Sequence, residues 1–208
     1  LIGDVSDKGV GAGLFMVLIR SFIRIFAERL SLNSARPERT FGESCSTAGK
    51  ARCSALEAVD ITNDYLLRVH GQEGMFATLF FGVLDSASGL LQYVSAGHET
   101  VYVFGDGIEP KYLGPTGPAV GLLESIQYQC RESALEPGAI LFGYTDGVTE
   151  ACSPSGEMFG KDRLQQILLA RADESAEAIH TAVGKAVHQF RAGRPQADDI
   201  TLVVIQAV

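Results

Sequence analysis

The residues of this sequence with the clearest chemical potential are acids at the ends of apolar, strand-like runs. Asp4 closes a short apolar run, Asp146 closes another, and the pair Asp198 and Asp199 precedes a third. A buried strand gains nothing from a carboxylate at its end. If the fold gathers these ends, their oxygens would form a cage for hard divalent cations. Such a cage suits metal-assisted hydrolysis, above all of phosphate esters.

Each of these acids also has a purely structural interpretation. Asp-Gly is a common turn pair, and an Asp beside a strand or helix often caps backbone amides. The neighbouring residues favour the functional interpretation for the three sites together. A glycine-rich turn follows Asp4, so Val5 could lend its carbonyl to a metal while Asp4 bridges two ions. Gly147 lets the chain bend sharply after Asp146 and leaves that carboxylate uncovered.

Length and composition narrow the class of protein. The 208 residues fit one domain, and 46% hydrophobic with 20% charged residues is ordinary for a globular protein. The formal charge of −8 argues against a nucleic-acid partner, because phosphate backbones are bound by clustered Lys and Arg. The four cysteines lie far apart without a C-x-x-C pair, which excludes a zinc-ligand pattern and predicts reduced thiols in a cytoplasmic protein.

Two features concern the environment and extent of the chain. The apolar run at residues 14–26 is interrupted by Arg20 and Arg24, well short of a membrane span, so no membrane segment is predicted. The sequence begins inside a strand-like run and without Met. We therefore expect an N-terminally truncated piece of a longer protein.

The periodicity of apolar residues predicts strands and helices in an order typical of a layered α+β domain. The predicted strands are 1–5, 76–84, 90–96, 100–104, 126–132, 139–144 and 200–205, and the predicted helices are 12–30, 54–69, 161–170 and 175–190. Short gaps between residues 76 and 104 predict an antiparallel meander. The polar segment 31–52 predicts a mobile surface loop.

Several phrases, in order along the chain, resemble the motifs of one enzyme family. Residues 3–12 are similar to its "DVSGKGxxA" segment, residues 77–85 with 95–98 to "TLFxGxLD…AGH", residues 144–151 to "YTDGVxEA", and Phe159-Gly160 with residues 198–202 to "FG…DDxTL". From residue 1 to the C-terminus the chain thus resembles the SpoIIE/RsbU-like branch of the PPM (protein phosphatase 2C) metal-dependent Ser/Thr phosphatases.

The resemblance implies a fold and a set of site residues. The fold would be an α-β-β-α sandwich, with two antiparallel sheets flanked by helix pairs, in a single domain over residues 1–208. Two Mn²⁺ or Mg²⁺ ions would be bridged by Asp4, and Val5 would offer its carbonyl to one of them. Asp146 and Asp198 would complete the other site, with Asp199 as a further ligand or a turn residue. Asp4, Asp146 and Asp198 would thereby be catalytic, aiming a metal-held water at phosphorus.

The sequence departs from the family pattern in two informative places. The family has an upstream strand with an acidic "GGDxxD" motif, which this chain does not include. Many relatives continue "AGH" with Asn-Pro, whereas Glu99 and Thr100 follow here. The first departure removes part of one metal site, and the second concerns contacts on the substrate side.

The resemblance also implies partners, and it leaves one alternative open. The substrate would be phosphoserine or phosphothreonine on a STAS-type anti-sigma-factor antagonist, with an upstream sensor or receiver domain in the full-length protein. The alternative is a degenerate phosphatase-like module that binds a phosphoprotein without turnover, which the missing upstream acid favours. A haloacid-dehalogenase-type mechanism is set aside, because Ser6 stands where the D-x-D motif needs its second acid.

Overall fold

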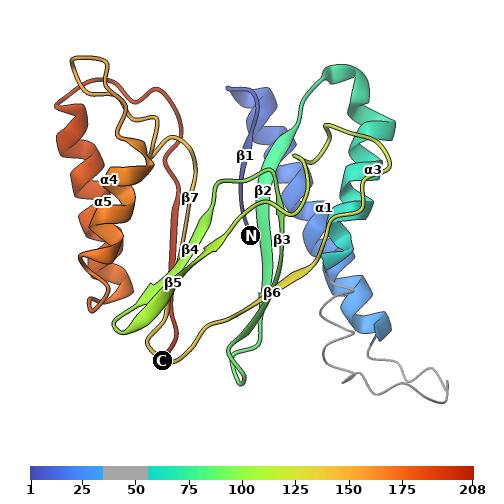
Figure 1. The fold of residues 1–208 in the computed structure, drawn as a ribbon. Coiled ribbons are helices and arrows are strands. Elements are labelled where there is room, and N and C mark those ends of the chain that lie inside the picture. Colours follow the sequence, from blue (N-terminus) through green and yellow to red (C-terminus); the bar gives the residue numbers. More distant parts are fainter. Residues whose placement is uncertain (35–55) are drawn as a thin grey trace. The chain divides into compact units, whose positions relative to one another are not determined.

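The computed structural model describes residues 1–34 and 56–208 of the chain, shown as a ribbon in Figure 1. These residues form two compact units, each with its own sheet, helices and hydrophobic core. Within the described ranges, unit 1 comprises Leu1, Gly3–His98 and Pro115–Ala134, and unit 2 comprises Ile2, Glu99–Gly114 and Leu135–Val208.

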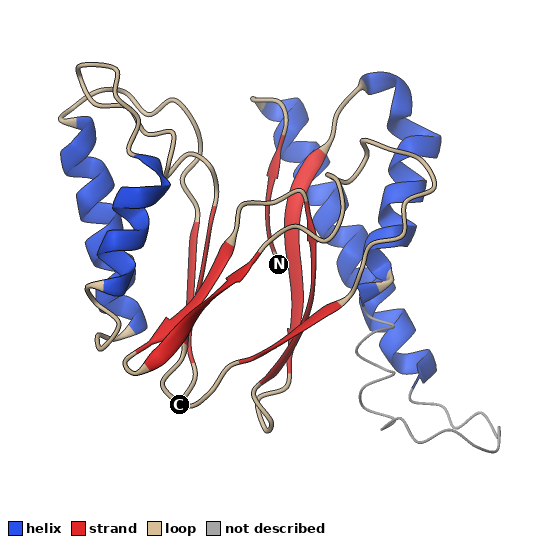
Figure 2. Ribbon diagram, viewed as in Figure 1, coloured by secondary structure: helices blue, strands red, loops and turns tan. Residues whose placement is uncertain are grey.

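Unit 1 is a four-stranded sheet covered by helices. Its strand order is β1-β2-β3-β6, with β1 at Ile2–Val5, β2 at Ala77–Leu84, β3 at Leu90–Ala96 and β6 at Arg131–Ala134. Strand β3 pairs antiparallel with both β2 and β6. The helices of this unit are α1 (Val10–Ser34), α3 (Ala58–His70) and the short 3-10 helix η1 (Gly71–Glu73). Figure 2 shows α1 and α3 side by side along this sheet.

Helix α1 packs one apolar face into the core of unit 1. Phe15, Ile19 and Ile23 are each at most 5% exposed, and their spacing of four residues places them on one side of the helix. By length and composition, α1 is the one helix in the described part of the chain that could cross a membrane, with a mean hydropathy of 1.8 over Val10–Leu30. A core helix meets the same criteria, so the absence of a membrane segment stays a prediction.

Unit 2 repeats the plan with different connections. Its sheet has the order β5-β4-β7-β8, with β4 at Val101–Gly105, β5 at Ile108–Leu113, β7 at Ile140–Tyr144 and β8 at Leu202–Gln206. All neighbours are antiparallel. Helices α4 (Gly160–Leu169) and α5 (Ala176–Arg191) supply Leu164, Leu168, Ile179 and Val183 to the core that they share with this sheet. The two antiparallel sheets and the four α-helices of the described residues confirm the predicted α+β class.

The predicted meander is wrong in its last strand. The predicted strand 90–96 coincides with β3, but β4 pairs with β5 and β7 rather than with β3. Gly97 explains the departure, since its φ of +64° turns the chain out of β3. A Cβ there would also lie 2.8 Å from the Ala119 amide nitrogen, so the position needs glycine.

Two strands differ from the prediction because tertiary contacts override local pattern. Strand β5 was not predicted, because it contains Pro110. It lies at the edge of its sheet, where the missing N–H of a proline is tolerated. The predicted strand 126–132 is wrong over most of its length, and β6 occupies 131–134 instead. Tyr128 is buried in the core of unit 1, and its amide donates to Asp60 Oδ1 at 2.9 Å.

The predicted mobile loop is only partly within the described residues. Residues 31–34 belong to α1, so that part of the prediction is wrong. Residues 35–52 lie outside the described residues. The next helix, predicted over 54–69, is α3 and begins at Ala58.

Candidate metal centre

Asp146 stands in a tight turn directly after β7. Its carbonyl accepts from the Glu150 amide at 2.8 Å and from Thr149 Oγ1 at 3.1 Å, which fixes the backbone. Its side-chain Oδ1 is buried and has no hydrogen-bond partner among the described residues. Nearly all buried polar atoms in native proteins have a partner, and a buried carboxylate oxygen without one is costly. The observation points to a positively charged ligand for this oxygen.

The segment that carries Asp198 and Asp199 lies against the same turn. A Cβ added to Gly147 would overlap the Asp199 carbonyl oxygen and lie 3.3 Å from the Asp198 carbonyl oxygen. Only glycine permits so close an approach of two backbones. The carboxylate of Asp198 accepts from the Asp199 amide at 2.9 Å, which orients it locally.

Asp4 and Val5 end β1 in unit 1. The Val5 amide donates to Asp4 Oδ1 at 3.0 Å. The following residue is tied to the start of β2, because the Ser6 amide donates to the Phe76 carbonyl at 2.9 Å and Ser6 Oγ accepts from the Phe76 amide at 3.1 Å. This double contact fixes where the turn after Val5 begins, and α1 follows it.

The structure therefore brings together three of the five predicted site residues. The turn of Asp146 and the backbone of Asp198 and Asp199 lie together at one end of the unit 2 sheet, whereas Asp4 and Val5 belong to unit 1. Across residues 1–34 and 56–208, no three His, Cys, Asp or Glu side chains are clustered closely enough to hold a metal by themselves. The participation of Asp4 and Val5 in one centre with Asp146 stays a prediction.

Carboxylates are the donors that Mg²⁺ and Mn²⁺ prefer, so the residues at this end of unit 2 fit a hard divalent cation. The buried, unpartnered Oδ1 of Asp146 is the structural feature that supports the fit. Two further features of the site were not predicted from the sequence. They are the hydrogen bonds of Thr145 to the 198–201 segment and the contacts of Glu99.

Glu99, which departs from the family pattern, is engaged within unit 2. Its Oε2 lies 2.8 Å from Lys161 Nζ, at the start of α4, and accepts from the Tyr144 hydroxyl at 3.2 Å. The hydrogen bond with Glu99 raises the pKa of Lys161, and burial raises the pKa of Tyr144. The phenol therefore stays protonated as a donor. Glu99 thus ties the last residue of β7, two residues before Asp146, to α4.

Loss of the Tyr144 hydroxyl is expected to lower the free energy of unfolding by about 1–2 kcal/mol, because a buried donor to a charged acceptor is removed. The measurement is urea unfolding of Tyr144→Phe. Tyr112→Phe is the matched control: Tyr112 is 52% exposed and its hydroxyl accepts from Gln165 Nε2 at 2.7 Å, so its loss should change stability by less than about 0.5 kcal/mol. Equal losses of stability in both variants would show that the hydrogen bond from Tyr144 to Glu99 contributes no more than an exposed one.

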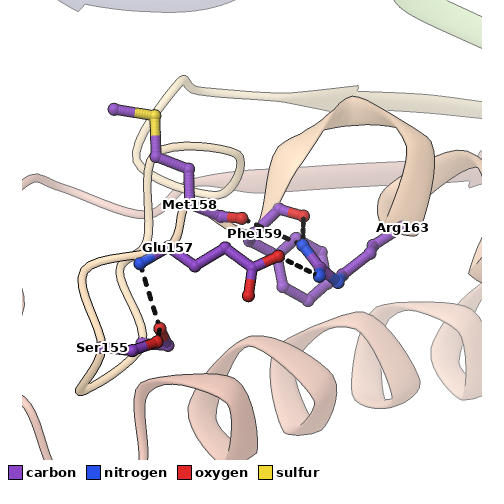
Figure 3. Close-up of polar contacts among 6 residues, drawn as sticks. Ser155, Glu157, Met158, Phe159 and Arg163 are labelled. Atoms are coloured by element: carbon purple, nitrogen blue, oxygen red, sulfur yellow. Dashed lines mark hydrogen bonds and ion pairs between the residues drawn. The ribbon is translucent and has the colours of Figure 1, made fainter.

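The loop that follows the Asp146 turn is held by one arginine of α4. Arg163 Nη1 donates to the carbonyls of Met158 at 3.0 Å and Phe159 at 2.9 Å, and its guanidinium pairs with Glu157, as Figure 3 shows. The same guanidinium lies 4.9 Å from the centre of the Phe190 ring of α5. Phe159-Gly160, one of the motif pairs, is therefore the point where this loop joins α4.

A second arginine connects this loop to the segment before Asp198. Arg194 Nη1 donates to the Ser153 carbonyl at 2.8 Å, and Arg191 Nη2 donates to the Arg194 carbonyl at 2.8 Å. The loops on both sides of the three acids are thus fixed by charged donors.

His98 lies in unit 1, at the end of the turn that follows β3. It is 3% exposed, and its Nδ1 is 3.0 Å from Thr78 Oγ1 of β2. Asp85 is likewise a turn residue, because its Oδ1 accepts from the Ala87 amide at 3.0 Å.

Comparison with known proteins gives consistent results. The family model described as stage II sporulation protein E (SpoIIE) matches residues 1–208. The chain is 39% identical over 219 residues to protein IcfG of Synechocystis sp. (strain ATCC 27184 / PCC 6803 / Kazusa), and the aligned region covers 99% of this chain and 33% of that protein. It is 26% identical over 136 residues to the phosphoserine phosphatase RsbU of Bacillus subtilis, covering 64% of this chain and 39% of RsbU. The chain thus spans about a third of the length of these relatives.

Solved structures share the fold. The SiaA-PP2C domain of Pseudomonas aeruginosa superposes with a TM-score of 0.72 at 22% identity, covering 98% of this chain and 73% of that one. The catalytic domain of the serine threonine protein phosphatase PstP, solved with 2 manganese ions, superposes with a TM-score of 0.57 at 14% identity, covering 97% and 84%. At these identities the likeness concerns the fold.

Proposed function

The chain belongs to the SpoIIE family and has the fold of PP2C phosphatase domains, and from this premise we propose that it is a metal-dependent protein serine/threonine phosphatase. It would hydrolyse phosphoserine or phosphothreonine on a regulatory protein in bacterial signalling. One observation carries the proposal. A carboxylate oxygen of Asp146 is buried without a hydrogen-bond partner in the described residues, beside the segment that bears Asp198 and Asp199.

The proposed cofactors are two Mn²⁺ or Mg²⁺ ions. Asp146 and Asp198 would hold one of them with the help of Asp199, and Asp4 with the Val5 carbonyl would contribute to both. When bound, such ions acidify the attacking water and offset charge on the phosphoryl oxygens.

The protein residues contribute position and environment. Asp146 is presented by a backbone whose carbonyl is already engaged, so its carboxylate is aimed without further ordering. Gly147 allows the 198–199 backbone to approach, and buried Val148 excludes water from the inner side of the turn. In such partly dry surroundings, the attraction between a carboxylate and a cation is stronger than in bulk water.

The substrate and setting are proposed from the relatives. RsbU is named a phosphoserine phosphatase, which supports a phosphoserine protein as substrate. We propose a STAS-type anti-sigma-factor antagonist as that protein, an upstream sensor or receiver domain in the full-length protein, and a cytoplasmic location. The alternative is a module that binds the phosphoprotein without turnover. It is favoured by the lack of a three-residue metal cluster in the described residues.

The test is phosphate release by this chain, and by a form extended upstream in its gene, from p-nitrophenyl phosphate and from a phosphoserine-bearing STAS domain. We expect turnover with Mn²⁺ or Mg²⁺ that EDTA abolishes. Binding of the phosphorylated STAS domain without any metal-dependent release, by either folded form, would reject the enzyme in favour of the binding module. A phosphotyrosine peptide is the control for substrate class.

A further inference from the structure

Thr145 lies between the last residue of β7 and Asp146, and its side chain is 1% exposed. Its hydroxyl donates to the Asp199 carbonyl at 2.9 Å and accepts from the Thr201 amide at 2.9 Å. Its own amide donates to the Thr201 carbonyl at 3.1 Å. Three hydrogen bonds therefore join this one residue to the segment that precedes β8.

These bonds begin where the strand pairing ends. The last register pair of β7 and β8 joins Tyr144 to Leu202, so the regular ladder stops one residue before Thr145. The Thr145 amide adds one further backbone bond, and the hydroxyl then takes the place of the next backbone partners. A hydroxyl can donate once and accept twice, so a single side chain can satisfy both Asp199 and Thr201. Val, which has the same shape, could satisfy neither.

The hydrogen bond from the Thr145 hydroxyl matters because of where its acceptor, the Asp199 carbonyl, lies. The Asp199 carbonyl oxygen that receives the Thr145 hydroxyl is the atom that a Cβ at Gly147 would overlap. The hydroxyl thus holds the Asp198–Asp199 backbone against the turn that carries Asp146.

We propose that Thr145 is a positioning residue that sets the spacing between the carboxylates of Asp146 and Asp198 for cation binding. This inference rests on the proposed metal-dependent function. Thr145 does not touch the cation; it acts through the Asp199 carbonyl and the Thr201 amide. Partners that orient metal ligands in this way typically change metal affinity by about 10–100-fold when removed.

The test compares Thr145→Val with Thr145→Ser. Mn²⁺ affinity is measured by the loss of the free-ion electron paramagnetic resonance signal, and the exchange rate of the Thr201 amide by hydrogen exchange. In Thr145→Val we expect Mn²⁺ affinity to fall by about 10–100-fold, with faster exchange at Thr201. Thr145→Ser keeps the hydroxyl and should restore both. Because Ser is the milder change, it keeps the test meaningful if the Val variant folds poorly.

Thr62→Val is the matched control. Thr62 is buried in unit 1, and its hydroxyl donates to the Ala58 carbonyl at 2.7 Å. The Thr62→Val variant therefore also loses a buried hydroxyl, but one in unit 1 rather than beside Asp146 and Asp198. It should leave Mn²⁺ affinity unchanged. Parent-like affinity in Thr145→Val, while Asp146→Asn weakens binding, would overturn the role of Thr145 alone. Mn²⁺ affinity in the parent that Asp146→Asn does not change would instead overturn the proposed function, and the role of Thr145 with it.

Discussion

Replacing Asp146 with Asn is expected to reduce metal-dependent phosphatase turnover by about 10³-fold or more, since a cation supplies several kcal/mol of transition-state stabilisation and each 1.4 kcal/mol is a factor of ten. Asn has the same shape as Asp, and only the charge is removed from the buried oxygen that lacks a protein partner. The measurement is kcat with p-nitrophenyl phosphate across a Mn²⁺ titration. Added Mn²⁺ should not restore the rate to that of the parent.

The same substitution should affect stability in the opposite direction. A buried carboxylate without a hydrogen-bond partner is a cost in the metal-free protein. Asp146→Asn should therefore leave the Tm in EDTA unchanged or raised, while it abolishes the rise in Tm that Mn²⁺ produces in the parent.

Asp106→Asn is the matched control for this prediction. Asp106 also precedes a glycine, in the turn between β4 and β5, and is exposed. It should change neither turnover nor the response to Mn²⁺. Full metal-dependent activity in Asp146→Asn would show that this carboxylate does not bind the cation.

The second large effect is expected at Gly147. In Gly147→Ala the new Cβ would overlap the Asp199 carbonyl oxygen and lie 3.0 Å from the Asp199 carbonyl carbon. Both are backbone atoms, so the Asp198–Asp199 segment must move. Overpacking of this kind typically costs about 1–3 kcal/mol of stability. We also expect Mn²⁺ affinity to fall by at least about 10-fold, as for other changes that displace metal ligands indirectly.

The comparison for Gly147→Ala is Gly184→Ala. Gly184 lies within α5, and a Cβ there would meet nothing within 4 Å. Replacing a helical glycine with Ala should stabilise the protein by about 0.5–1 kcal/mol. Urea unfolding and Mn²⁺ titration of both variants separate the two cases. A Gly147→Ala protein with parental stability and metal affinity would mean that the 198–199 backbone does not need this close approach.

The part of the site that the sequence predicts is local. An Asp before a glycine at the end of an apolar run predicts a turn, and Asp146-Gly147 form a turn after β7. The predicted exposure of the carboxylate is wrong for Oδ1, which is buried because the distant 198–199 backbone packs against this turn. An apolar alternation predicts a strand, and residues 90–96 form β3. These predictions depend only on neighbours in the chain.

The parts that could not be predicted depend on residues far apart in sequence. The Thr145–Asp199 bond spans 54 residues and the Tyr144–Glu99 bond spans 45. A threonine before an aspartate looks the same whether its hydroxyl meets water or a distant carbonyl. Likewise, nothing beside Lys161 indicates that Glu99 will be its partner. The sequence also could not predict which sheet β4 joins. The periodicity of apolar residues shows which faces of a strand are buried, but not which strands lie beside it.

The position of β8 at the edge of its sheet has a consequence for what a bound cation would stabilise. Strand β8 is at one edge of the sheet, where β7 is its one neighbouring strand among the described residues, and it is only half-buried. Marginal strands open most readily and offer free backbone groups to other chains. An ion held between Asp146 and Asp198 would link the segment that leads into β8 to the turn that follows β7. The proposed catalytic cation would then also protect the protein from fraying and self-association, and metal-starved protein would aggregate before it unfolds.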